Sequence, residues 1–263
     1  MKISLVTITY NAAATLQPTL DSVSMQEYDD VEHIIIDGAS TDATADIARR
    51  YAEKTAEKDT GHVVTVVSEP DNGLYDAMNK GLRLVTGAYV CFLNAGDRLP
   101  HPDTLTKMVE TAQMAGDGHL PGVLYGDTDL IDAEGNYLGH RHLSVPEKLT
   151  WRSFRNGMLV CHQAFYARTD IAKEVAYDTR YRYSADVDWC IRVMRRAEQM
   201  QAPLCRVAGV IALYLREGET TRHHRESLRE RFDVMRHHYG LMTTLAMHAW
   251  FSIRAGWRKL ISH

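Results

Sequence analysis

Short apolar runs alternate with stretches of helical periodicity through the first part of the chain. The apolar runs occupy residues 3–9, 31–36, 63–67 and 89–93. Leu16, Leu20 and Val23 recur at helical spacing after the first run, and further helices are predicted at residues 42–58, 75–85 and 103–112. Strands that alternate with helices form a mostly parallel sheet covered on both faces. We therefore expect an α/β fold that binds its ligands at the carboxyl ends of the strands.

The alternation becomes irregular after about residue 120. Residues 133–136 (AEGN) are typical of a hairpin turn. A helix is expected from Ser184, whose hydroxyl group can cap it. The apolar residues at helical spacing in this helix are Val187, Ile191, Met194 and Ala197. Residues 223–263 are predicted to be helical throughout.

These patterns suggest one α/β domain followed by a helical extension. The domain covers residues 1–222, with halves at 1–100 and 101–222, and the extension covers 223–263. The composition is that of a globular protein, 45% hydrophobic and 24% charged, and the formal net charge of -4 argues against a nucleic-acid partner.

Cysteine usage and hydrophobicity indicate a cytoplasmic protein. No C-x-x-C spacing links Cys91, Cys161, Cys190 and Cys205, so we expect free thiols in a reducing compartment. The N-terminus has no signal-peptide pattern, and the most apolar internal run, residues 204–215, is too short to cross a bilayer.

Polar clusters follow each of the four predicted strands. They are Thr9-Tyr10-Asn11, Asp37-Gly38-Ala39-Ser40-Thr41-Asp42, Glu69-Pro70-Asp71-Asn72-Gly73 and Asn94-Ala95-Gly96-Asp97. Each cluster alone could simply form a turn. Four clusters at the same edge of one sheet favour a single binding site instead.

Four segments resemble, in this order, the signature of family 2 glycosyltransferases with a GT-A fold. They are residues 4–11 (SLVTITYN), 36–42 (IDGASTD), 69–81 (EPDNGLYDAMNKG) and 92–97 (FLNAGD). The resemblance extends to about residue 220 and is closest to bacterial enzymes that build capsular, exopolysaccharide or colanic-acid-like glycans. It implies a Rossmann-like sheet and the inverting transfer of a hexose from a nucleoside diphosphate donor to a hydroxyl of a glycan or lipid-linked acceptor.

The resemblance also implies a donor pocket at the strand ends. Asp37 would bind the nucleotide base, as a carboxylate can accept the ring N–H of uracil, so a UDP-sugar is the expected donor. Thr9, Tyr10 and Glu69 would shape the base and ribose pocket. The other residues assigned to the donor are Asn11, Ser40, Asp71, Asn72, Gly73, Asn79, Asn94, Ala95 and Gly96. In the alternative interpretation, Asp71 only caps the helix that follows it.

Asn94-Ala95-Gly96-Asp97 occupies the position of the family's acidic metal motif, D-x-D. Only Asp97 is a carboxylate, and it is the expected ligand of Mg²⁺ or Mn²⁺, which would neutralise the diphosphate leaving group. Gly96 stands where a companion acid is expected, which leaves metal affinity and metal choice open. Asn94 is alternatively a ribose contact.

The second reacting group is expected from residues 184–192 (SADVDWCIR), which resemble the family's E-D motif. Ala185 replaces the Glu, and Asp186 lies at the position of the catalytic base, which would take the proton of the acceptor hydroxyl. Asp188 is assigned to the catalytic site as a residue that orients substrate. Alternatively, both acids complement a helix dipole.

Two further groups are assigned to the acceptor or the phosphates. His162 and Gln163 resemble a recurring His-Gln pair, although a structural role for the histidine is the alternative. Arg222 and His223, with His224, lie in a family loop that closes over the diphosphate, although solvation at the surface explains them equally well. The Q-x-x-R-W motif of processive relatives is absent, so we expect one sugar per encounter.

The C-terminal residues 248–263 suit a helix in the interface of an anionic membrane. Their apolar side chains are Trp250, Phe251, Ile253, Trp257, Leu260 and Ile261, and their cations are Arg254, Arg258 and Lys259. Docking on the protein's own domain or on a second subunit, as in a homodimer, is the competing arrangement.

Other classes of function fit less well. A sugar nucleotidyltransferase usually carries a Gly-rich basic loop after the first strand, and a dehydrogenase a G-x-G-x-x-G segment. Neither follows the first strand here. A non-catalytic protein that binds nucleotide sugars remains the main alternative, because Gly96 and Ala185 stand where acids are expected.

Overall fold

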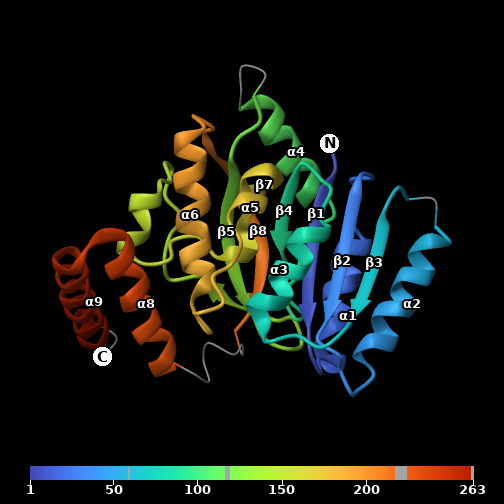
Figure 1. Cartoon of the computed structure of the whole chain (residues 1–263), viewed down its shortest axis with the longest axis horizontal. Coiled ribbons are helices and arrows are strands. Elements are labelled where there is room, and N and C mark those ends of the chain that lie inside the picture. Colours follow the sequence, from blue (N-terminus) through green and yellow to red (C-terminus); the bar gives the residue numbers. More distant parts are fainter. Residues whose placement is uncertain (59, 116–118, 217–223, 262–263) are drawn as a thin grey trace.

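The computed structural model describes residues 1–58, 60–115, 119–216 and 224–261, without the side chains of residues 224 and 255–261. One eight-stranded sheet runs through the molecule in the order β3-β2-β1-β4-β7-β5-β6, and β8 pairs with β5 (Figure 1). The strands are β1 (Ile3–Thr9), β2 (Val31–Asp37), β3 (Val63–Ser68), β4 (Tyr89–Phe92), β5 (Val123–Ile131), β6 (Tyr137–His140), β7 (Phe165–Arg168) and β8 (Leu204–Leu215).

The first four strands are parallel and alternate with helices, which confirms the predicted α/β pattern. The helices are α1 (Ala13–Ser24), α2 (Thr44–Ala56), α3 (Leu74–Leu84) and α4 (Thr104–Met114). Side chains alternate between the two faces of a strand. Ile34 and Ile36 accordingly join the main core, whereas Ile35 packs with Leu16 of α1 and Tyr51 of α2 on the other face.

The second half adds strands that the sequence pattern located less well. β7 pairs antiparallel with β4 and β5, and the predicted hairpin joins β5 to β6. In its turn the carboxylate of Asp132 accepts the Asn136 N–H at 2.8 Å, and Gly135 has a φ of 91°. The short elements here are the 3₁₀ helices η1 (Trp151–Asn156) and η2 (His162–Ala164) and the helix α5 (Thr169–Glu174).

α6 (Ala185–Gln199) buries the stripe that its periodicity predicted. The predicted cap is wrong, because the Ser184 hydroxyl donates to the Ser227 carbonyl at 3.2 Å and no side chain caps the helix. This hydroxyl instead ties the start of α6 to α8 (His224–Tyr239).

The prediction of continuous helix from residue 223 is also wrong in one respect. Gly240, with a φ of 81°, separates α8 from α9 (Leu241–Ile261). α8 and α9 pack side by side next to α6 and η1 (Figure 1). No helix in the described part of the chain is long and apolar enough to cross a membrane. The four cysteines are free thiols, as predicted.

Candidate active site

The ends of β1, β2 and β3 meet at one place. A Cβ atom built on Gly38, after β2, would lie 2.6 Å from Asp71 Oδ2 and 3.3 Å from Tyr10 Cδ2. Gly38 therefore allows the loops after β1 and β3 to close on the loop after β2. Three of the polar clusters in the sequence thus converge, as expected for the carboxyl edge of a parallel sheet.

The Asp37 carboxylate is buried at the end of β2. It accepts hydrogen bonds from the Ser40 N–H at 3.0 Å, from the Ser40 hydroxyl, and from the Ser68 hydroxyl at 2.6 Å. These donors fix its orientation. Sequence reasoning missed Ser68, although its position as the last residue of β3, in register with Asp37, is a usable signal.

Asn11 and Thr9, at the end of β1, lie next to Asp37 and its loop. Asn11 has a φ of 46°, its N–H donates to Ser40 Oγ at 2.8 Å, and its side-chain oxygen accepts the Thr41 N–H at 2.9 Å. Thr9 Oγ1 is buried and has no hydrogen-bond partner among the described residues. Buried hydroxyl groups are nearly always paired. Thr9 therefore offers a free donor and acceptor beside Asp37, the neighbour of Thr9 in the sheet register.

The loop after β3 is braced by its own residues. Lys80 Nζ lies 2.8 Å from Glu69 Oε1, and Asp71 Oδ1 accepts the Gly73 N–H at 2.8 Å. Asp71 therefore stabilises the turn, whereas the N-cap position of α3 belongs to Gly73. The neighbouring Asn72 N–H donates to Asp76 Oδ2 at 3.0 Å.

Asn79 does not join this group. Its amide donates to the Tyr177 carbonyl at 3.0 Å and accepts the Tyr177 N–H at 2.7 Å. The nitrogen and the oxygen of the side-chain amide are therefore both bonded to the backbone of Tyr177. We therefore correct its assignment from a donor contact to a link between α3 and the segment before α6.

Asp97 is buried just past β4. Its Oδ1 accepts the Leu215 N–H at 3.0 Å, and its Oδ2 accepts from Gln163 Nε2 at 2.9 Å. Burial raises the pKa of Asp97 to about 6, against the opposing effect of these hydrogen bonds. A nearby cation would stabilise the ionised form of such a buried carboxylate.

The backbone and packing at Gly96 disfavour a second acid. It has a φ of 102°, and a Cβ atom there would lie 2.5 Å from Leu215 Cδ2. Its N–H donates to Thr19 Oγ1 at 2.8 Å, so the adjoining Ala95-Gly96 backbone is fixed against α1. Asn94 Oδ1, by contrast, is buried without a partner in the described part of the chain.

Asp186 lies at the first turn of α6 and is 15% exposed. Tyr75, at the start of α3, donates to Asp186 Oδ1 at 3.1 Å, and His162 Nδ1 lies 3.3 Å from Asp186 Oδ2. Burial raises the pKa of Asp186, but the hydrogen bond and charge of His162 and the charge of Arg231 outweigh it. The net pKa lies below the ordinary value, so Asp186 is ionised at neutral pH.

The short helix η2 brings the two carboxylates together. His162 contacts Asp186, and its neighbour Gln163 contacts Asp97. His162 Nε2 also lies 3.3 Å from Asn94 Nδ2. Acids that are distant in sequence therefore face the same three-residue segment. Tyr75, at the start of α3, connects Asp186 to the loop after β3.

Asp188 belongs elsewhere. It is buried and contacts Arg192 Nε at 2.6 Å and His238 Nε2 at 2.7 Å. Arg195 NH2 also donates to the His238 carbonyl at 3.2 Å. These contacts join α6 to α8, and we correct the catalytic assignment of Asp188 accordingly. Residues two apart on a helix face different directions.

Sequence reasoning missed two further neighbours of the acids. Arg231 of α8 lowers the pKa of Asp186 through its charge. Burial, then the charge of Asp97, raises the pKa of Tyr214 to about 12. Neither residue belongs to a recognisable sequence motif. Each lies near the acids because elements that are distant in sequence pack together. Arg222 and His223 lie outside the described residues, as do the side chain of His224 and those of residues 255–263.

The chemistry of the donors suits a hard divalent cation. The Asp97 carboxylate and the unpartnered Asn94 Oδ1 offer oxygen atoms, the kind of ligand that Mg²⁺ and Mn²⁺ prefer. No group of three His, Cys, Asp or Glu residues that could hold a metal occurs in the described part of the chain. Such an ion would therefore take its remaining ligands from phosphate oxygens and water, which is the usual arrangement for Mg²⁺.

Comparison with known proteins agrees with this geometry. Residues 4–176 match the family described as glycosyl transferase family 2. The chain is 35% identical over 190 residues to the PGL/p-HBAD biosynthesis glycosyltransferase of Mycobacterium bovis, covering 72% of this chain and 68% of that protein. It is 30% identical over 199 residues to the amylovoran biosynthesis glycosyltransferase AmsB of Erwinia amylovora, covering 72% and 62%.

Solved structures share the fold. S. aureus TarS 1-349 in complex with UDP-GlcNAc superposes with a TM-score of 0.69 at 19% identity, covering 90% of this chain and 65% of that one. The mannosyltransferase PcManGT from Pyrobaculum calidifontis, in complex with GDP-Man and Mn²⁺, gives 0.63 at 20% identity, covering 100% and 81%. The expected GT-A fold is confirmed. The chain belongs to glycosyl transferase family 2.

Proposed function

We propose that this glycosyltransferase moves a hexose from a nucleoside diphosphate sugar, UDP being the best-fitting nucleotide, to an acceptor hydroxyl with inversion. One observation carries the proposal. The adjacent residues His162 and Gln163 contact Asp186 and Asp97, which supports a base and a metal ligand at one reaction centre. Transfer of one sugar per encounter is part of the proposal.

The residues have distinct roles in this reaction. Asp37, oriented by Ser40 and Ser68, accepts a ring N–H of the base, and Thr9 Oγ1 is free to bind the nucleoside. When bound by Asp97 and Asn94, a divalent cation supplies positive charge for the departing diphosphate.

Asp186 is the proposed base. It is ionised at neutral pH, and its contacts with Tyr75 and His162 hold its carboxylate in one orientation. It would take the proton of the acceptor hydroxyl as that oxygen attacks the anomeric carbon opposite the departing diphosphate. General base catalysis of this kind contributes a factor of roughly 10²–10⁴ in rate.

A non-catalytic nucleotide-sugar-binding protein is the second candidate. Gly96 and Ala185 favour it, since neither offers the acid expected there. Two observations favour an enzyme. Burial makes the charge of Asp97 costly, and Tyr75 holds the Asp186 carboxylate in place.

Donor turnover separates the two candidates. The chain would be incubated with UDP-, GDP- and dTDP-sugars and Mn²⁺, and release of nucleoside diphosphate would be measured. We expect release with one donor class that is lost on Asp97→Ala and strongly reduced on Asp186→Ala, whereas the exposed control Asp46→Ala behaves as wild type. Binding without release by wild-type protein would favour the non-catalytic candidate. With an acceptor in hand, NMR of the first product tests inversion.

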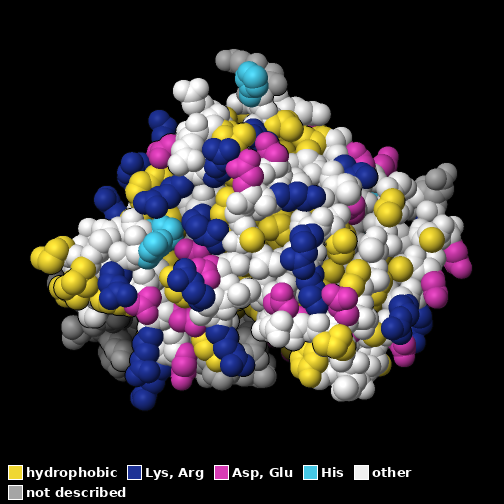
Figure 2. All heavy atoms as spheres, viewed as in Figure 1, with side chains coloured by type: hydrophobic (Ala, Val, Ile, Leu, Met, Phe, Trp, Pro, Cys, Tyr) yellow, Lys and Arg dark blue, Asp and Glu magenta, His cyan; other side chains and the backbone are white. Residues whose placement is uncertain are grey.

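The similarity to AmsB supports a role in polysaccharide synthesis. We propose that the acceptor is a glycan or a lipid-linked sugar and that transfer takes place at the cytoplasmic face of the membrane. An exposed apolar stripe on α9 supports peripheral membrane contact. Met242 is 79% exposed, Leu245 48%, Trp250 53% and Ile253 54%. Hydrophobic side chains gather at the α9 end of the molecule (Figure 2). A homodimer through this stripe is the competing arrangement.

A further inference from the structure

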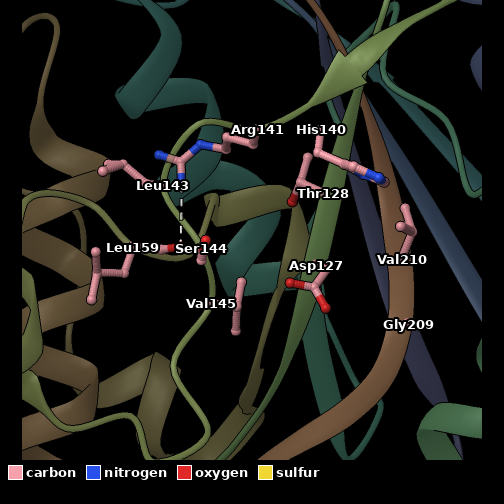
Figure 3. Close-up of a pocket in the computed structure, with 10 residues that line it drawn as sticks. All are labelled: Asp127, Thr128, His140, Arg141, Leu143, Ser144, Val145, Leu159, Gly209 and Val210. Atoms are coloured by element: carbon pink, nitrogen blue, oxygen red, sulfur yellow. Dashed lines mark hydrogen bonds between the residues drawn. The ribbon is translucent and has the colours of Figure 1, made fainter. Parts of the chain in front are cut away.

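A cavity lies near the proposed reaction centre. It has a volume of about 280 Å³ and opens between β5, β8 and the loop that follows β6 (Figure 3). Asp127 and Thr128 line it from β5, and Ser144 and Val145 face them across the cavity. These residues are not part of the proposed donor site and are distinct from Asp97 and Asp186.

An irregularity in β5 creates this cavity. Adjacent residues of a regular strand point to opposite faces. The pairing of β5 with β8 shifts register on both sides of Asp127, and both Asp127 and Thr128 line the cavity. Strand bulges often re-aim side chains in this way next to binding sites. Gly209, with a φ of 87° and nothing within 4 Å of its missing Cβ, keeps the β8 side open.

A buried hydroxyl in the cavity wall has only a weak partner. Thr128 is 4% exposed, and among the described residues its Oγ1 has no hydrogen-bond partner other than the Cys161 thiol, whose pKa it lowers against the larger raising effect of burial. Asp127, beside it, is held in place by Arg206 at 2.9 Å. Since buried hydroxyl groups are nearly always well paired and a thiol is only a weak hydrogen-bonding group, Thr128 retains hydrogen-bonding capacity for a ligand.

The charges around the cavity disfavour an anionic ligand. Arg206 is neutralised by Asp127 and by Glu147 at 2.8 Å. The Arg141 guanidinium donates to the carbonyls of Met158 and Leu159, at 2.5 Å and 3.1 Å. A carboxylate, two hydroxyls and aliphatic walls instead match an uncharged group that carries several hydroxyls.

The cavity adjoins the reaction centre. Leu159 lines it, and His162, three residues later, contacts Asp186. Three residues of chain span at most about 11 Å. On the basis of the proposed function, we infer that this cavity binds an uncharged sugar unit of the acceptor glycan, removed from the hydroxyl that is attacked.

Binding of simple glycosides tests this inference without any nucleotide. The ¹⁵N-labelled full chain would be titrated with methyl glycosides of glucose, galactose, mannose and N-acetylglucosamine, and separately with inorganic phosphate. We expect at least one glycoside to shift the amide signals of Thr128 and Gly209. Thr128→Val and Ser144→Ala should each weaken that binding, the former by about tenfold. The matched control Thr65→Val, exposed on β3, should bind like wild type.

Three results would overturn the inference: no glycoside shifts these signals, both variants bind as tightly as wild type, or only phosphate binds there. Donor turnover is a separate measurement, because Thr128→Val leaves the donor residues intact. Absence of glycoside binding by the wild-type chain, together with normal release of nucleoside diphosphate, would therefore count against the cavity and not against the glycosyltransferase reaction. Loss of glycoside binding in Thr128→Val with normal release would support the cavity.

Discussion

Asp97 combines burial with a charge that the folded protein holds at a cost. Its pKa is raised to about 6, so the folded state keeps the proton more tightly than the unfolded state does. Between the unfolded value of about 4 and the folded value of about 6, stability therefore falls as pH rises, and above pH 6 the penalty is constant.

Asp97→Asn removes this penalty. We expect the variant to exceed wild type in free energy of unfolding by about 1–3 kcal/mol at pH 7.5, with the advantage shrinking toward pH 4. Urea unfolding of both proteins without metal, across this pH range, is the measurement. A variant that is less stable than wild type at pH 7.5 would show that the carboxylate is well stabilised where it lies.

His162 sets the protonation of Asp186 in this account. Because its hydrogen bond and charge lower the pKa of Asp186, His162→Gln should raise that pKa. The acidic limb of the pH profile of kcat/KM, which reports the base in the free enzyme, should then move to higher pH. His101→Gln, an exposed change after β4, serves as the control. An unmoved acidic limb would argue that Asp186 is not the base.

At the scale of elements, α6 carries two acids with different tasks. Asp188→Asn leaves Arg192 and His238 without their carboxylate in a buried contact, so we expect a loss of roughly 3 kcal/mol in urea unfolding with catalysis largely retained. Asp186→Asn should do the reverse, abolishing most transfer with little loss of stability. Equal losses of activity in the two variants would restore Asp188 to the catalytic site.

The same helix shows how far sequence reasoning reaches. Periodicity found the first four strands and the buried stripe of α6, because both depend on the local pattern of apolar and polar residues. Periodicity could not show which side of α6 faces the site. The contact that joins Asp188 to α8 is made by His238, fifty residues later in the sequence. Asn79 and Ser184 were misassigned for the same reason, as their partners, Tyr177 and Ser227, come from packing between distant elements.

At the scale of the whole molecule, α9 presents apolar side chains that the rest of the protein leaves exposed. If this stripe lies on a membrane, the chain should sediment with vesicles that contain phosphatidylglycerol, and Trp250→Ser with Ile253→Ser should release it. Met114→Ser, at a residue 83% exposed on α4, is the matched control. Unchanged sedimentation of the double variant, or its conversion from dimer to monomer, would contradict membrane binding.

The central claim is that Asp97 binds the donor through a metal while Asp186 acts on the acceptor. Calorimetric titration with UDP, with and without Mn²⁺, tests it most directly. We predict that Mn²⁺ tightens UDP binding to wild type and to Asp186→Asn, and that Asp97→Asn loses this gain but keeps its affinity without metal. A full manganese-dependent gain in Asp97→Asn would contradict the claim.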